Sequence, residues 1–322
     1  MNVNIRLAPR IAAVMGALIA DSAALGLHWI YDPGRIAEIE NTKGITFLPP
    51  QSEHYANVKG YFVHGGKDAG ASSAYGEICL LILKHLAEHV EFKRIEYQTA
   101  FKNHFGPGGN YTGYIDTPTR QILLKLIPLK PEEFPEVSGV DDDQFAALAT
   151  VPVITAAHKG SRDALLEKVE QVVRLTHHND DAVAAAKYTA SVLSAVLEGE
   201  PVKDALTSSL SVAGEKLTPL LNDALNTNSL NSVVAAQHFG SACHVLEGVP
   251  VIAHILRHAT SYQQAVEANI RASGDNCGRA IMLGAIAAAA AEVGNDSNAT
   301  IPLPWLATYK NLVIAADACA YL

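Results

Sequence analysis

Apolar residues recur at helical spacing along most of the chain. Between residues 78 and 89 they fall at positions i, i+3, i+4, i+7, i+8 and i+11, which places them on one face of a helix. The members of this stripe are Ile78, Leu81, Ile82, His85, Leu86 and His89. We therefore expect a helix over this segment, with the stripe packed inward.

Two further helices are predicted towards the carboxyl end. The first follows Thr260, a capping residue with Gln263 three residues later, and stops at Gly274; its sequence is TSYQQAVEANIRASG. The second follows Gly278 and ends at Gly294; its sequence is RAIMLGAIAAAAAEVG. Because its Ala and Gly residues let another backbone approach closely, we expect it to be a central helix.

Strands with alternating apolar and polar positions are scarce. The best candidate is residues 60–65, GYFVHG, which is short and bounded by glycines. Proline-rich segments at residues 128–135 and 302–304 break helices and are interpreted as connections within one domain. The fold is therefore predicted to be all-α, a single domain over residues 1–322 that forms an irregular, orthogonal helical bundle.

Composition narrows the class of protein. The 322 residues are 49% hydrophobic and 18% charged, enough for one large core. Polar residues such as Asp21 interrupt the apolar runs before they reach the roughly 18 residues of a membrane span, so no membrane partner is expected. A net charge of −9 without a basic stripe argues against nucleic acid.

The cysteines and the start of the chain bear on the compartment. The four cysteines lie far apart without C-x-x-C spacing, which indicates neither a disulfide scaffold nor a zinc knuckle. The first residues lack the small-residue cleavage pattern of a secretory signal. We therefore expect reduced thiols and a cytoplasmic protein.

Polar residues gather in five segments between the apolar helices. Loops of this kind can meet at one end of a bundle and form a pocket, and we expect a shared pocket here. The segments are residues 21–32 (DSAALGLHWIYD), 66–77 (GKDAGASSAYGE), 110–120 (NYTGYIDTPTR), 140–144 (VDDDQ) and 273–279 (SGDNCGR).

The last segment stands immediately before the small-residue helix. Free N–H groups and the helix dipole favour an anion there, so a phosphate or carboxylate can dock. The simpler interpretation is that Asp275 or Asn276 caps the helix. The same N-terminus, together with Arg279, would lower the pKa of the Cys277 thiol; the alternative is a small buried residue without reactivity.

Read in order, the segments resemble the ADP-ribosylglycohydrolase family over about residues 10–320. The helix with Asp21 is similar to the family's opening Gly-Asp-Ala-Leu-Gly region. Residues 70–86 (GASSAYGEICLLILKHL) are placed like its Thr-Asp-Asp-Thr segment, and residues 273–289 (SGDNCGRAIMLGAIAAA) like its Gly-Gly-Asp-Thr-Asp-Thr helix start. Closer still to its J-crystallin branch are the details LHWIYD, SAYGE, GYIDTPTR, GSACHV and GDNCGRA.

The resemblance implies Mg²⁺ as a cofactor, because the family's hydrolases hold two magnesium ions among carboxylates and threonine hydroxyls. Most matching positions differ here. His28 stands where the family has a glutamate, Ala74 and Tyr75 replace the paired acids of the middle motif, and Cys277 replaces the second acid of the late motif. Asp275 is left as a weak candidate metal ligand, so we do not expect a two-magnesium site.

Other residues can supply part of this chemistry. Ser73 can replace the first threonine of the middle motif, and the run Asp141, Asp142 and Asp143 lies near where the family has an Asn-Gly pair. His28 and Cys277 can bind zinc, or act as base and nucleophile, if they lie together. Glu77 and Asp116 can donate or accept a proton in glycosidic hydrolysis, or simply cap helices. The catalytic candidates are Asp275, Glu77, Asp142 and Cys277.

The remaining candidates concern binding. Trp29 and Tyr75 can stack on an adenine-like or nicotinamide-like ring, or belong to the core. Arg279 can hold a substrate phosphate, or pair with Asp275 or Asp142. The substrate-binding candidates are His28, Trp29, Ser73, Tyr75, Tyr114, Asp116, Asn276 and Arg279.

The sequence thus supports two hypotheses of different classes. The first is an ADP-ribosylglycohydrolase-like hydrolase with a degenerate metal site, acting on a ribosyl N- or O-glycosidic bond of a small-molecule or ADP-ribosylated substrate. The alternative is a non-catalytic, J-crystallin-like ligand-binding or structural protein. The two differ in whether a ribosyl substrate is turned over. The sequence sets no expectation for the oligomeric state.

Overall fold

The structure, a computed structural model, describes residues 6–227 and 231–322. Within these ranges the regular structure is helical, and the only strand-like pairings are three isolated backbone bridges. The all-α prediction is therefore confirmed. The α-helices are α1 (Pro9–Ala24), α2 (Pro33–Lys43), α3 (Ala74–His89), α4 (Arg94–Phe105), α5 (Thr117–Leu126), α6 (Val151–Ala157), α7 (Arg162–Val173), α8 (Asp180–Leu197), α9 (Val202–Ser208), α10 (Gly214–Asn226), α11 (Ser232–Phe239), α12 (Val245–His258), α13 (Tyr262–Arg271), α14 (Asn276–Val293), α15 (Leu303–Thr308) and α16 (Leu312–Cys319). Short 3-10 helices are η1 (Leu25–Leu27), η2 (Ser52–Tyr55), η3 (Pro131–Glu133), η4 (Phe145–Leu148) and η5 (Ser209–Val212).

Helices α1 and α14 form the centre of the molecule and pack on each other more extensively than any other pair of described elements. Their backbones meet at two glycines. A Cβ added at Gly16 would lie 2.5 Å from the carbonyl oxygen of Gly284 and 2.4 Å from the Cβ of Ala288. Only glycine permits this approach, so the prediction of a central small-residue helix is confirmed.

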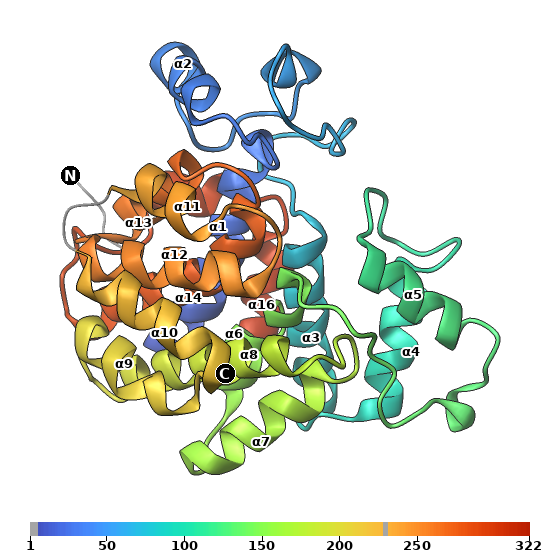
Figure 1. Cartoon of the computed structure of the whole chain (residues 1–322). Helices are drawn as coiled ribbons and strands as arrows, with labels where there is room; N and C mark the ends of the chain where they lie inside the picture. The colour runs from blue at the N-terminus through green and yellow to red at the C-terminus, as the bar shows by residue number, and fades with distance from the viewer. Residues whose placement is uncertain (1–5, 228–230) are drawn as a thin grey trace.

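The other helices surround this pair (Figure 1). Helix α8 contacts α7, α14 and α6, while α12 contacts α10, α11 and α14. Helix α3 packs against α1, α4 and α16. Helix α2 lies at the top of Figure 1, and α4 and α5 lie at its right, outside the main body.

Two helical stretches are long and apolar enough to cross a membrane, Pro9–Leu27 and Asn276–Val293. In each, 89% of the apolar window is buried inside the protein. They are the central helices described above, and their apolar surface is covered by other helices. Both stretches are therefore helices of the core.

The structure shifts some predicted boundaries. The stripe at residues 78–89 lies in α3, as predicted. Helix α13 is capped by Ser261, whose Oγ accepts the N–H of Gln264 at 3.1 Å, so the prediction of Thr260 as the cap is wrong. The helix ends at Arg271, three residues before Gly274. The strand candidate at residues 60–65 forms no strand; only Gly60 pairs, in a single bridge with Ile30.

Candidate functional site

The carboxylate of Asp275 is the centre of the site. Asp275 is the N-cap of α14, and its Oδ1 accepts the N–H of Gly278 at 2.9 Å. The side chain is fully buried. The capping interpretation is thus confirmed, and this carboxylate already fills the place where a phosphate would dock at the helix N-terminus.

Two side chains from distant segments donate to this carboxylate. His28, just after η1, places its Nε2 2.8 Å from Asp275 Oδ1. Tyr75, in the first turn of α3, donates its hydroxyl to Asp275 Oδ2 at 2.8 Å. Burial opposes ionisation of Asp275, but the His28 ring, the Gly278 N–H and the Tyr75 hydroxyl outweigh it and hold its pKa below the ordinary value. Burial raises the pKa of Tyr75, so its hydroxyl keeps the proton that it donates.

His64 extends this network on the other side of His28. The Nε2 of His64 lies 2.7 Å from the Nδ1 of His28, so both ring nitrogens of His28 are engaged. Burial, together with His28 and Lys67, lowers the pKa of His64 well below its ordinary value, so its ring is neutral. His64 is a site residue that could not be predicted from the sequence, because its segment GYFVHG carries only a strand-like signal.

Asp21 and Ser73 form a second buried hydrogen-bonded group, next to the network around Asp275. The backbone N–H of Ser73 donates to Asp21 Oδ2 at 2.9 Å, and the Ser73 hydroxyl donates to Asp21 Oδ1. Ser73 also caps α3 by accepting the N–H of Tyr75 at 3.1 Å, which orients that residue. Burial raises the pKa of Asp21 to about 7. Asp21 lies inside α1 rather than in a loop, which corrects the interpretation of residues 21–32 as a connecting segment.

Cys277 does not have the environment of a reactive thiol. Its Sγ lies 3.6 Å from the carbonyl oxygen of Asp21, which accepts the weak thiol bond. Burial and the charges of Asp21 and Asp275 raise its pKa well above the ordinary value. The expectation of a lowered pKa is therefore wrong, because burial outweighs the helix N-terminus and Arg279. His28 and Cys277 bond to different partners, so the structure does not pair them as zinc ligands or as base and nucleophile.

An aromatic contact covers the histidines. The rings of Trp29 and Tyr114 meet edge to face with centroids 5.1 Å apart, and the rings of Trp29 and His28 lie 4.4 Å apart. Trp29 has φ 63°, a left-handed conformation that bulky residues rarely adopt. The structure thus brings two of the predicted substrate-binding residues into contact, and their binding role stays a prediction.

Asp116 follows Tyr114 by two residues and caps α5. Its Oδ1 accepts the N–H of Thr119 at 2.9 Å. Its Oδ2 is buried and has no hydrogen-bond partner among the described residues, and the residue is 4% exposed. Burial raises the pKa of Asp116, and the charges of Asp142 and Asp275 raise it further. Asp116 is therefore a carboxyl group with one oxygen available for a ligand.

Asp142 and Glu77 stand at the margin of this group. Asp142 accepts the backbone N–H of Gln144 at 2.9 Å and its side-chain amide at 3.0 Å. Burial raises the pKa of Asp142. Glu77, on α3, pairs instead with His104 of α4 at 3.1 Å, so one of its oxygens is already engaged.

Arg279 and Asn276 lie in the core rather than at a surface. Arg279 is 0% exposed; its Nε donates to Asn269 Oδ1 at 2.9 Å and one Nη donates to the Ser273 carbonyl. Asn276 donates to the Leu27 carbonyl at 3.2 Å. Asn269 and the backbone turn the guanidinium inward, and no described carboxylate forms an ion pair with it, but its second Nη is buried without a partner among the described residues. That Arg279 holds a phosphate stays a prediction. Burial lowers its pKa to about 10.

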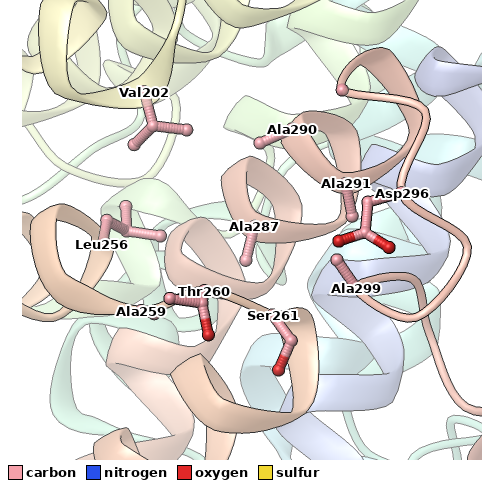
Figure 2. A pocket seen from close by; sticks show the side chains of 11 residues that line it. Val202, Leu256, Ala259, Thr260, Ser261, Ala287, Ala290, Ala291, Asp296 and Ala299 are labelled. Carbon is pink, nitrogen blue, oxygen red and sulfur yellow. The ribbon is translucent and has the colours of Figure 1, made fainter.

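Contacts join four of the five polar segments directly. Residues 21–32 and 66–77 reach Asp275 and one another, and residues 110–120 reach Trp29. The fifth segment, residues 140–144, is linked to them electrostatically, because the charge of Asp142 raises the pKa of Asp116. A cavity of about 200 Å³ lies away from these residues, at the carboxyl end of α14; it is lined mainly by small and apolar side chains, with Asp296 at one side (Figure 2).

The donor set does not fit a pair of magnesium ions. Among residues 6–227 and 231–322 no three His, Cys, Asp or Glu side chains are arranged to hold a metal ion. Both oxygens of Asp275 and both oxygens of Asp21 accept hydrogen bonds from protein groups. A small hard cation needs several anionic oxygens to replace its water, and the four oxygens of Asp275 and Asp21 are already engaged by protein donors.

Comparison with known proteins shows to which family the chain belongs. Residues 6–320 match the family described as ADP-ribosylglycohydrolase. The chain belongs to the ADP-ribosylglycohydrolase family. Similar relatives are Crystallin J1A of Tripedalia cystophora, 30% identical over 307 residues, and Crystallin J1B of the same organism, 28% identical; each match covers 92% of this chain and 90% of the relative. The resemblance deduced from the motifs is thus confirmed.

The fold is shared with a solved member of the group. A structure described as an ADP-ribosylglycohydrolase-related protein complex superposes with a TM-score of 0.68 over 98% of this chain and 96% of that one. The sequence identity is 14%, so this likeness concerns the fold alone.

Proposed function

We propose that this protein hydrolyses a ribosyl N- or O-glycosidic bond of an ADP-ribose-related substrate, either a small molecule or an ADP-ribosylated group, without a two-magnesium centre. The observation that carries the proposal is the buried carboxyl of Asp116. One of its oxygens has no partner among the described residues, and it lies two residues from the Tyr114 ring that contacts Trp29. Family membership supports the reaction class.

Each residue has a role that follows from its environment. Because burial raises the pKa of Asp116, this carboxyl holds a proton more readily than an exposed aspartate does and can give it to the leaving group as the glycosidic bond breaks. Asp142, which influences Asp116 electrostatically, is the second carboxyl and would accept a proton from the attacking water. Trp29 and Tyr114 offer ring faces for a base or sugar. The Asp275 network holds the histidines in place beneath them.

The magnesium requirement of the family is proposed to be absent. Asp275 and Asp21 are held by protein donors, so metal binding would have to break bonds that the fold already makes. We also propose a cytoplasmic location and no nucleic-acid or membrane partner, in keeping with the four free cysteines and the negative net charge.

A second candidate function has an observation of its own. Asp275, His28 and Tyr75 satisfy one another so fully that this network needs no ligand to be stable. Two relatives are named crystallins. Both facts favour a protein that keeps the fold for ligand binding or as a stable structural component without turnover.

Release of ADP-ribose from N- and O-linked ADP-ribosylated substrates, followed with and without EDTA, separates the two candidates. The proposal expects turnover in EDTA that falls by at least about a hundredfold in Asp116→Asn, since a general acid contributes roughly that much. Asp223→Asn, an exposed partner of His238, is the matched control and should retain full rate. Absence of turnover on every ribosyl substrate, with ADP-ribose still bound, would favour the non-catalytic candidate.

A further inference from the structure

Among the buried polar atoms near Asp275 that have no partner in the described residues, two are ring nitrogens on neighbouring aromatic side chains. One is Nδ1 of His64, a residue 2% exposed, and the other is the indole Nε1 of Trp29, a residue 8% exposed. Buried polar atoms in folded proteins are nearly always hydrogen-bonded, because an unmade bond leaves the desolvation cost uncompensated. An unpartnered pair on neighbouring rings therefore indicates a ligand contact.

The position of His64 Nδ1 is fixed by a chain of hydrogen bonds. Asp275 is ionised and can only accept, so His28 must donate its Nε2–H to it at 2.8 Å. A single proton then lies between His28 Nδ1 and His64 Nε2, 2.7 Å apart. Since the Gly278 N–H also anchors Asp275, the chain runs from the α14 backbone to His64 and leaves Nδ1 as its free end.

The position of Trp29 is fixed by backbone contacts on both sides. The backbone N–H of Trp29 donates to the Gly274 carbonyl at 2.9 Å, and the backbone carbonyl of Trp29 accepts the N–H of Tyr61 at 3.1 Å. These bonds maintain the left-handed conformation at φ 63°. The indole ring lies at 24° to the His64 ring, with centroids 6.4 Å apart. A bulky residue in this backbone region persists where the surroundings impose it, commonly at ligand sites.

We infer that His64 Nδ1 and Trp29 Nε1 together bind the hydroxyl groups of a sugar or polyol ligand. A hydroxyl both donates and accepts, so it matches an indole N–H, which only donates, and an imidazole nitrogen, which takes either role. A carboxylate ligand would face Asp275, Asp116 and Asp142, and an ammonium group could not accept from the indole. The inference rests on the proposed function only in expecting that the sugar is a ribosyl unit.

Matched substitutions separate the two ends of the His64 ring. In His64→Gln the side-chain amide can still reach His28 in place of Nε2, but nothing replaces Nδ1. In His64→Asn the amide replaces Nδ1, but the contact with His28 is lost. Trp29→Phe removes the indole N–H and keeps an aromatic ring, and Trp305→Phe, remote from these contacts, is the control.

The measurement is calorimetric titration with ADP-ribose and with D-ribose. We expect about tenfold weaker binding of both ligands in His64→Gln and Trp29→Phe, the loss typical of one neutral hydrogen bond, with melting temperatures near that of the original protein. Trp305→Phe should bind normally. His64→Asn should melt earlier and keep more of the affinity than His64→Gln. Where a variant fails to fold, the Nδ1 resonance of His64 in the original protein, labelled with ¹⁵N-histidine, should move when ADP-ribose is added.

The outcomes are distinct from those of the turnover assay. Binding without turnover would contradict the proposed hydrolysis and leave the His64 contact standing. Equal affinities for the original protein, His64→Gln and Trp29→Phe would overturn the inference, as would a His64 resonance that ADP-ribose does not move. Failure of the original protein to bind either ligand would also overturn it.

Discussion

Tyr75 and Asp275, from the first turn of α3 and the N-cap of α14, are joined by a 2.8 Å hydrogen bond in the interior. By its motif, Tyr75 stands where the family has an acid. The neutral Tyr75 hydroxyl therefore donates to the Asp275 carboxylate at the position where the family resemblance implies a second metal-binding acid. Hydrogen bonds from His28, Gly278 and Tyr75 favour the ionised state of Asp275.

Removing that donor should destabilise the fold. A hydrogen bond to a charged group contributes about 1.5–3 kcal/mol, so Tyr75→Phe should lower the free energy of unfolding by about 2 kcal/mol at pH 7. Urea denaturation measures the change. The control is Tyr97→Phe, because the buried Tyr97 hydroxyl has no partner among the described residues and its loss should cost little. Equal losses in both variants would contradict the assigned bond.

Asp21 gives the stability a pH dependence of known sign. Its pKa is raised from 3.8 to about 7 by burial, so between these values the folded state binds a proton that the unfolded state has released. The protonated Asp21 carboxyl contributes fully to the free energy of unfolding below pH 3.8. This contribution is lost as the pH rises towards 7, at up to about 1.4 kcal/mol per pH unit. Asp21→Asn keeps an acceptor for Ser73 and removes this slope.

Denaturation of the original protein and of Asp21→Asn at several pH values tests this. The variant should gain stability relative to the original protein as the pH rises from 4 to 7. The exposed Asp223→Asn should show no such trend. A difference between Asp21→Asn and the original protein that stays constant over this interval would show that Asp21 is ionised in the fold.

The cysteines should differ in their reaction with alkylating reagents. Cys79, Cys277 and Cys319 are buried, and Cys243 is partly exposed. Burial raises the pKa of Cys243 to about 12, so even this thiol should react slowly at neutral pH. Peptide mass spectrometry after brief exposure of the native protein to N-ethylmaleimide should find Cys243 modified first. Modification of Cys277 at the same rate would place it in a more open environment than the structure gives it.

The contact between α1 and α14 should not tolerate a methyl group. In Gly16→Ala the new Cβ would meet Ala288 and the Gly284 carbonyl at separations that real atoms do not adopt. Overpacking of this kind costs about 1–3 kcal/mol or more, so thermal unfolding should occur well below that of the original protein. Gly294→Ala is the control, since its nearest contact is the Ala290 carbonyl at 3.1 Å and its φ is −69°. Equal melting temperatures for the two variants would contradict the close approach.

The helices could be predicted from the sequence better than their ends. The periodic stripe located α3, and the Ala-rich run located α14, because burial of one face imposes a period on the chain. The start of α13 was misplaced by one residue. Thr260 and Ser261 are both good caps, and the choice depends on which adopts the extended conformation, as Ser261 does at φ −149°.

The sequence predicted those site residues whose role depends on their own segment, and missed those whose partners are distant along the chain. Asp275 could be found from its motif, and its capping role followed from its place before a helix. His64 could not, because its partner His28 is 36 residues away and only the fold brings the two rings together. The burial of Arg279 could not be predicted either, since nothing in its own segment reveals that Asn269 turns the guanidinium inward.

The pairing of α1 with α14 also has a kinetic consequence. Residues 9–24 are made early in translation, but the surface that covers them is not made until residues 276–293 emerge. Contacts so distant along the chain are slow to form, because a long loop must close first. During synthesis the face of α1 that packs on α14 stays uncovered, so we expect nascent chains that stop short of residue 276 to be captured by chaperones or to aggregate.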